Sequence, residues 1–133
     1  MALEAKLKIE GKSYTVLESS YEFNQPIDNN GKPSAYPRGG LINITIQAPD
    51  NKDSLFHEWM FSKSEVKDGA IDFTVTKELN HNSKVLKFEY AHCIYLNEYF
   101  NNTNTIQMYL KITLSAAIIK FGSVTYTNNE LLV

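Results

Sequence analysis

The stretch that decides the fold reads Arg38-Gly-Gly-Leu-Ile-Asn-Ile-Thr-Ile-Gln47. From Ile42 onward, isoleucines alternate with polar residues, and this period of two is typical of a β-strand with one buried face. The two glycines before it, Gly39 and Gly40, predict either a positive φ or a close approach of the backbone that a Cβ would block. The sequence therefore predicts a strand preceded by two residues whose backbone has a positive φ or lies close to another part of the chain.

Alternation of the same kind continues on both sides of this strand. The alternating stretches are residues 3–9, 14–23, 71–76, 86–96, 106–115 and 124–127. The first two predict a β-hairpin that turns at Gly11-Lys12 and carries an irregularity near Leu17, as in a β-bulge. Asn-rich loops are expected at residues 79–83 and 99–104. About seven strands with hairpin-like spacing favour an antiparallel barrel or sandwich.

A single short helix is expected after the strand at residues 41–47. Four apolar residues recur there at the spacing of one helical face: Leu55, Phe56, Trp59 and Met60. This stripe predicts a helix whose apolar side joins the core. Asp53 or Ser54 can serve as its N-cap, and the helix is expected to end between Phe61 and Lys63.

Residues 24–37, called the arm below, show no periodicity and are rich in turn-forming residues, including Pro26, Pro33 and the run Asp28-Asn-Asn-Gly31. Irregular segments of this length are uncommon in compact domains and are usually functional or disordered. The residues alone leave two interpretations open. The arm is either an inert surface connection or an element that docks on another copy of the chain or on a different partner.

Length and charge bound the class of protein. A chain of 133 residues suits one domain, so we expect a single domain over residues 1–133. The 13 basic and 15 acidic residues give a net charge of −2, which argues against binding to nucleic-acid backbones and to anionic membranes. The longest apolar stretch is far too short to span a membrane, and the first residues alternate instead of forming an apolar leader. The low net charge also permits self-association.

No pattern in the sequence predicts a catalytic, metal or cofactor site. His57, His81 and His92 lack the spacing of a metal motif, and Cys93 is best interpreted as a buried small hydrophobe. Glu58 is expected on a solvent or partner face of the helix. Two rival hypotheses remain open. One is a monomeric β-barrel carrier of small molecules, suggested by the alternating strands and eight tyrosines, and the other is a barrel enzyme that uses Glu58 or His92.

Several stretches, taken in chain order, resemble the Hcp (haemolysin-coregulated protein, TssD) tube proteins of type VI secretion systems, in particular their divergent short branch. The most specific combination is Gly31-Lys-Pro-Ser34, followed by Arg38-Gly-Gly40 and by Glu58-Trp-Met60 of the expected helix. The matching stretches are residues 7–17, 21–25, 28–34, 38–46, 55–60, 87–93 and 108–116. They cover nearly the whole chain, although residues 128–133 lack the aromatic ending of the family.

The resemblance implies a fold and a role. The fold is mainly β, an antiparallel two-sheet β-barrel with one short α-helix and a long extended loop, as in phage tail tubes. The role is that of a structural subunit, without enzymatic activity or cofactor, that assembles as homo-hexameric rings stacked into a tube inside a contractile sheath. A spike protein tips the tube, and effector proteins travel with it. The subunit is expected in the cytoplasm before assembly and is then secreted through the type VI apparatus without a signal peptide, with no nucleic acid and no membrane insertion involved.

The resemblance also implies that the arm and its foot form the ring-stacking and subunit interface. The residues expected there are Gly31, Lys32, Pro33, Ser34, Arg38, Gly39 and Gly40. Outward polar positions on the strands are expected to line either a wet lumen or a ring interface. These positions are Asn43, Thr45, Gln107, Lys111 and Thr113.

Overall fold

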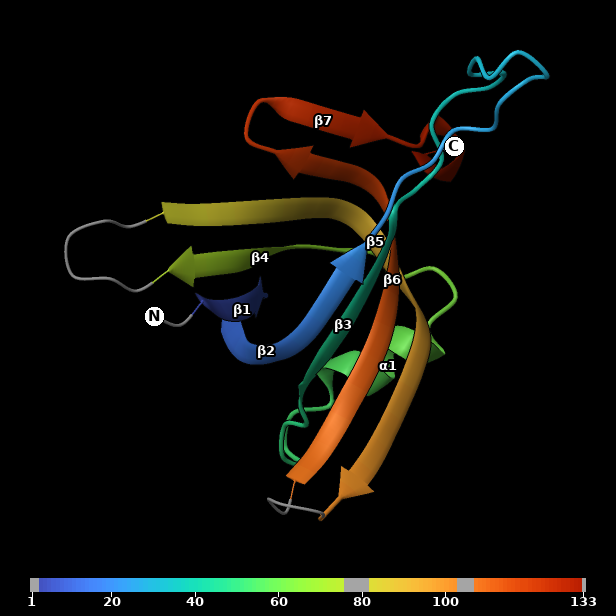
Figure 1. Ribbon diagram of the computed structural model, residues 1–133. Helices are drawn as coiled ribbons and strands as arrows, with labels where there is room; N and C mark the ends of the chain where they lie inside the picture. The colour runs from blue at the N-terminus through green and yellow to red at the C-terminus, as the bar shows by residue number, and fades with distance from the viewer. Residues whose placement is uncertain (1–2, 76–81, 103–106, 133) are drawn as a thin grey trace.

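The computed structural model describes residues 3–75, 82–102 and 107–132, and Figure 1 shows their arrangement. The elements, in chain order, are β1 (Leu3–Ile9), β2 (Lys12–Tyr21), β3 (Leu41–Gln47), α1 (Leu55–Phe61), β4 (Lys67–Val75), β5 (Asn82–Asn101), β6 (Gln107–Phe121), β7 (Val124–Thr127) and the 3₁₀ helix η1 (Asn129–Leu132). Some predicted positions lie outside the described residues: Thr76, residues 79–81 of the expected turn with His81, residues 103–104 of the expected loop, and Ile106.

The strands form one antiparallel sheet in the order β3-β2-β1-β4-β5-β6-β7. The sheet closes into a barrel because β3 also pairs with β6, from Leu41 opposite Ser115 to Gln47 opposite Tyr109. β7 lies outside the closed barrel and pairs with the last residues of β6. The prediction of an antiparallel β-barrel with one short α-helix is thereby confirmed.

Side chains from the strands and the helix fill the barrel interior. Ile42, Ile44 and Ile46 are buried, as the alternation in β3 predicts, and Phe56 and Trp59 of α1 are buried with them. Burial of a large apolar side chain contributes about 1.5–3 kcal/mol. The filled interior therefore supplies much of the stability and holds α1 against β5, as Figure 1 shows.

The helix begins and ends where its sequence pattern predicts. Leu55, the first residue of α1, donates its backbone N–H to Oδ1 of Asp53 at 3.2 Å, which satisfies one of the free donors at the helix N-terminus. Leu55 is buried together with Phe56 and Trp59, and Met60 is partly buried against the same core. The apolar stripe therefore points into the barrel, and the helix ends at Phe61.

Within the residues that the structure describes, the sheet departs from regular pairing at three places. The register between β2 and β3 shifts at Leu17, where the sequence predicts a bulge. β5 carries two further shifts, one near Tyr90, which has a φ of 53°, and one at Ile94. β5 also continues to Asn101, so the expectation of a loop beginning at residue 99 is wrong, because pairing with β6 extends the strand through polar residues.

Candidate assembly surface

The arm projects from the barrel as a narrow double limb between β2 and β3, at the upper right of Figure 1. At its base, Asn24 and Arg38 exchange backbone hydrogen bonds of 2.9 and 2.7 Å. Further out, Ser34 donates its N–H to the carbonyl of Pro26 at 2.8 Å, and Ile27 lies opposite Pro33. The arm therefore contains no regular strand, in keeping with its aperiodic sequence, but it is internally hydrogen-bonded.

The tip of the arm is closed by the side chain of Asp28. Its Oδ1 accepts the backbone N–H groups of Asn30 and Lys32 at 2.8 and 3.0 Å. The carbonyl of Asp28 also accepts the N–H of Gly31, whose φ of 83° favours glycine. This Asx-type turn sets the conformation of the segment that carries the predicted interface residues Lys32, Pro33 and Ser34.

The foot of the arm is formed by the two glycines. Gly40 has a φ of 97°, and a Cβ placed on it would lie 2.8 Å from the carbonyl oxygen of Ala116. A Cβ on Gly39 would lie 2.1 Å from a ring carbon of Phe23. The sequence pattern predicted a tight approach or a positive φ, and Gly40 combines the two.

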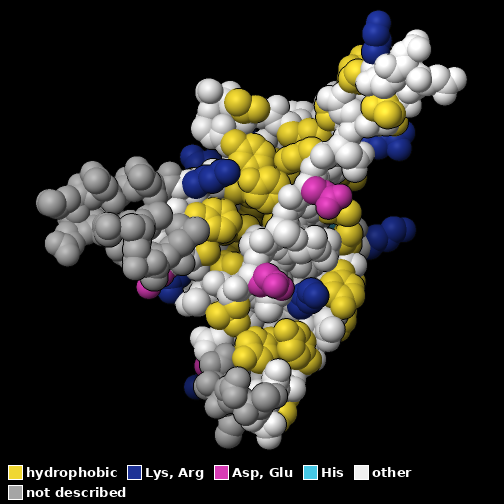
Figure 2. Space-filling model, in the orientation of Figure 1, with side chains coloured by type: hydrophobic (Ala, Val, Ile, Leu, Met, Phe, Trp, Pro, Cys, Tyr) yellow, Lys and Arg dark blue, Asp and Glu magenta, His cyan; other side chains and the backbone are white. Residues whose placement is uncertain are grey.

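The surface of the arm combines exposed apolar and basic side chains, which Figure 2 shows on its projecting part. Ile27 is 66% exposed and Tyr36 is 90% exposed, so much of their apolar surface is in contact with water. Lys32 and Arg38 are exposed as well. These exposed side chains on a projecting segment are available for contact with another surface.

The outward polar positions form a short row across three strands. Asn43 of β3 accepts a hydrogen bond from the hydroxyl of Thr113 of β6 at 2.8 Å and donates one to Ser20 of β2 at 3.4 Å. Lys111 is exposed, and the side chain of Gln107 lies outside what the structure describes. Thr45 differs from the prediction of an outward position that faces water, because it is only 7% exposed.

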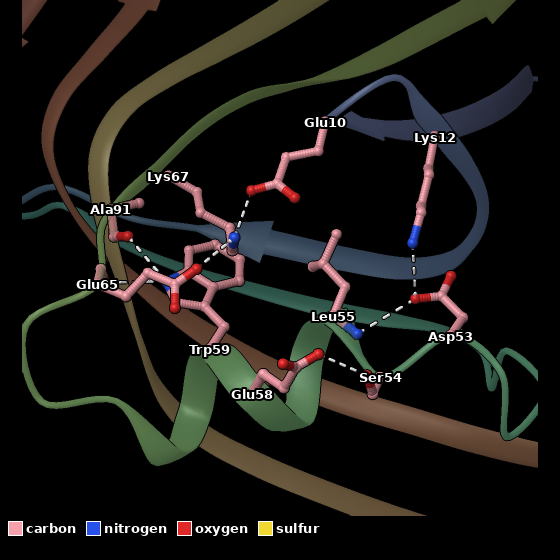
Figure 3. Close-up of polar contacts among 10 residues, drawn as sticks. All are labelled: Glu10, Lys12, Asp53, Ser54, Leu55, Glu58, Trp59, Glu65, Lys67 and Ala91. Carbon is pink, nitrogen blue, oxygen red and sulfur yellow. Dashed lines mark hydrogen bonds and ion pairs between the residues drawn. The ribbon is translucent and has the colours of Figure 1, made fainter.

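A second polar cluster, which the sequence analysis missed, lies where α1 meets the barrel (Figure 3). Lys67 contacts Glu10 and Glu65, and its ammonium lies 5.9 Å from the centre of the Trp59 ring. The Trp59 indole N–H lies 3.2 Å from the carbonyl oxygens of Glu65 and Ala91. Partial burial alone would lower the pKa of Lys67, but its hydrogen bonds to the two glutamates outweigh burial and raise it. Lys67 is therefore a paired cation and not a free base.

The side chains weighed for chemistry do not come together. His57 Nε2 lies 3.5 Å from the carboxylate of Glu98, and Glu58 accepts a hydrogen bond from the Ser54 hydroxyl at 2.5 Å. Cys93 is buried, and burial raises the pKa of its thiol to about 11, which leaves it unreactive near neutral pH. Among residues 3–75, 82–102 and 107–132, no three His, Cys, Asp or Glu side chains gather as metal ligands would.

The described part of the chain also contains no helix with the length and apolar character needed to cross a membrane.

Comparison with known proteins gives consistent matches. A family model described as hemolysin coregulated protein Hcp (TssD) matches residues 1–129. The solved structure of Hcp1 from Flavobacterium johnsoniae is 30% identical, with a TM-score of 0.84, and the match covers 94% of this chain and 99% of that chain. A search of curated protein sequences gave no match.

Two more distant structures are similar in fold. Secreted protein Hcp3 from Pseudomonas aeruginosa is 11% identical, with a TM-score of 0.66 over 96% of this chain and 97% of that chain. A chain in the sheath-tube complex of an extracellular contractile injection system (PVC), in its extended state, is 19% identical, with a TM-score of 0.53 over 90% and 88% of the two chains.

Proposed function

This chain belongs to the Hcp (TssD) family, and we propose that it is a structural subunit of the inner tube of a type VI secretion system. In this proposal it assembles as homo-hexameric rings, and the rings stack into a tube within a contractile sheath. The tube is expelled together with a spike protein and effector proteins. The role of the chain is then structural, because the surface of each subunit binds further copies of the same subunit.

The observation that carries this proposal is the ordered arm with its exposed Ile27 and Tyr36. The arm joins the Leu41 end of β3, whereas α1 follows the Gln47 end, so the two lie toward opposite ends of the barrel (Figure 1). A surface at one end that docks on a different surface at the other end makes a head-to-tail contact, and such contacts build rings and stacks.

Within this proposal, the arm residues divide by task. Five residues contact the neighbouring subunit or the next ring. Gly31, Lys32, Pro33 and Ser34 lie near the tip of the arm, and Arg38 lies at its base. Gly39 and Gly40 allow the backbone of the foot to lie against Phe23 and Ala116. The row of Asn43 and Thr113 and the exposed Lys111 face a polar environment, either the lumen or a ring interface.

Native mass spectrometry and negative-stain microscopy of the purified chain test the proposal. We expect an assembly of six times the 15.2 kDa subunit mass, and annular particles that stack. A variant that lacks residues 29–34 is expected to keep the barrel fold and to lose stacking and secretion. A chain that stays monomeric at every concentration would contradict the tube, and unaltered stacking in the deletion variant would exclude the arm from it.

A further inference from the structure

Four aromatic side chains gather at the foot of the arm. They come from the end of β2, from the residue just before the arm, from the end of β6 and from β7, and they are Tyr21, Phe23, Phe121 and Tyr126. The ring centroids of Phe23 and Tyr126 are 4.9 Å apart, and those of Tyr21 and Phe121 are 5.2 Å apart. The ring centroid of Phe23 lies 6.1 Å from that of Tyr21 and 6.1 Å from that of Phe121. Phe23 therefore packs against the other three rings.

The same cluster holds the returning limb of the arm. The ring of Phe23 occupies the space that a side chain on Gly39 would need. The Tyr126 hydroxyl lies 3.3 Å from the carbonyl oxygen of Gly39, to which it donates a hydrogen bond. One residue further along, the carbonyl of Gly40 accepts the N–H of Ala116 at 2.8 Å, which ties this limb to β6. Both limbs are therefore fixed at one point.

β7 contributes to this cluster although it takes no part in closing the barrel. The barrel closes through the pairing of β3 with β6, and β7 is attached outside it. Of the four residues of β7, three are exposed, and Tyr126 alone is partly buried. The residue of β7 that faces inward is thus the one that contacts Phe23 and Gly39.

We infer that Tyr21, Phe23, Phe121 and Tyr126 form an aromatic brace that fixes the direction in which the arm leaves the barrel, and that β7 supplies its outer wall. The brace determines direction because it fixes both limbs at the foot, whereas the hydrogen bonds further out determine only the shape of the arm. A pre-oriented arm needs less ordering when it docks, which favours stacking; this last step rests on the proposed tube function.

Distance measurements between two spin labels test the direction of the arm. The labels are placed through Asn30→Cys at the arm tip and Lys52→Cys before α1, both at exposed positions. Cys93 stays native because it is buried. The labelled protein is diluted into unlabelled protein, so that distances between subunits do not contribute. We expect a narrow distance distribution that becomes at least about two-fold wider after Phe23→Ala.

The matched control is Phe61→Ala, which removes a phenylalanine that is 82% exposed and lies outside the brace. It is expected to leave the distribution unchanged. If Phe23→Ala fails to fold, Gly39→Ala serves as the second variant, because its Cβ displaces the Phe23 ring and should shift or widen the distribution. A distribution that is the same as the wild type in a folded Phe23→Ala or Gly39→Ala variant would overturn the brace.

Sedimentation of the same variants tests the step that depends on assembly. Rings that form but no longer stack in Phe23→Ala support the role of the brace in assembly, and normal stacking contradicts that role. If the wild-type chain forms no rings, the proposed function fails, while the distance distributions still decide whether the brace directs the arm.

Discussion

The hydroxyl oxygen of Tyr14 lies 2.6 Å from the carboxylate of Asp53, and this hydrogen bond ties the β1–β2 hairpin to the start of α1. Asp53 also accepts the N–H of Leu55 at 3.2 Å and contacts the Lys12 ammonium at 3.2 Å. Partial burial on its own would raise the pKa of Asp53, but the hydrogen bonds from Tyr14, Leu55 and Lys12 outweigh it and lower the pKa. One ionised carboxylate thus joins the start of β2 to the start of α1.

Tyr14→Phe is expected to reduce the free energy of unfolding by about 1.5–3 kcal/mol at pH 7, the value of a hydrogen bond to a charged group. The folded-state pKa of Asp53 lies below its unfolded value of about 4, so this stabilisation is complete above that pH and is lost as the pH falls through the folded-state pKa. Urea unfolding of both proteins between pH 2 and pH 7 measures the difference. A difference that stays constant over this range would contradict the assignment.

The alkaline side gives an independent check on the same pair. Burial, the hydrogen bond to Asp53 and the charge of Asp53 raise the pKa of Tyr14. The stabilisation from Tyr14 is therefore complete below the unfolded pKa of about 10 and declines at higher pH. Above pH 10, the stability of the wild type should approach that of Tyr14→Phe, and spectrophotometric titration should show one tyrosine that ionises late.

Trp59→Ala is expected to destabilise the protein by about 3–5 kcal/mol, the range for truncation of a large aromatic side chain in a core. The ring is completely buried, and its loss also leaves the Lys67 side chain without the surface on which it lies. Chemical denaturation with circular dichroism measures the change. Phe61→Ala, at the exposed end of the same helix, serves as the control and should change stability by less than about 0.5 kcal/mol.

The features that sequence alone predicted are those encoded by neighbouring residues. The period of two in β3, the stripe of α1 and the bulge at Leu17 depend on side chains only a few positions apart. The conformational demand on Gly40 was visible for the same reason, because glycine pairs beside a strand signal backbone positions that other residues avoid.

The features that were missed depend on partners distant in the chain. Lys67 and Glu10 are 57 positions apart, and no local pattern joins them. Thr45 follows the polar alternation of β3 but is buried, so periodicity did not predict its exposure. The sequence did not predict the contact between Phe23 and Tyr126. Tyr126 belongs to a short strand, and the pattern of that strand predicts only that it pairs with another strand.

Gly40→Ala should destabilise the protein more than Gly31→Ala does. Both residues have a positive φ, which costs a residue with a side chain about 1 kcal/mol or more. At Gly31 an added Cβ meets open space, whereas at Gly40 it meets the carbonyl oxygen of Ala116. The difference between the two variants, measured by thermal and urea unfolding, therefore isolates the steric part. Equal losses of stability would show that the backbone at the foot of the arm shifts to accommodate the added Cβ without a cost in free energy.

Asp28→Ala is expected to open the tip of the arm without affecting its base. The variant removes the oxygen that accepts the N–H groups of Asn30 and Lys32, so their amide hydrogens should exchange about ten-fold faster. The amide of Arg38, which is bonded to the carbonyl of Asn24, should keep its rate. Hydrogen exchange followed by NMR resolves these amides individually.

Asp28→Asn is the matched control, because it keeps an oxygen at the same position and should preserve the slow exchange. If Asp28→Ala and Asp28→Asn exchange equally fast at the tip, the side chain of Asp28 does not hold the turn, and the tip is shaped by its backbone bonds alone.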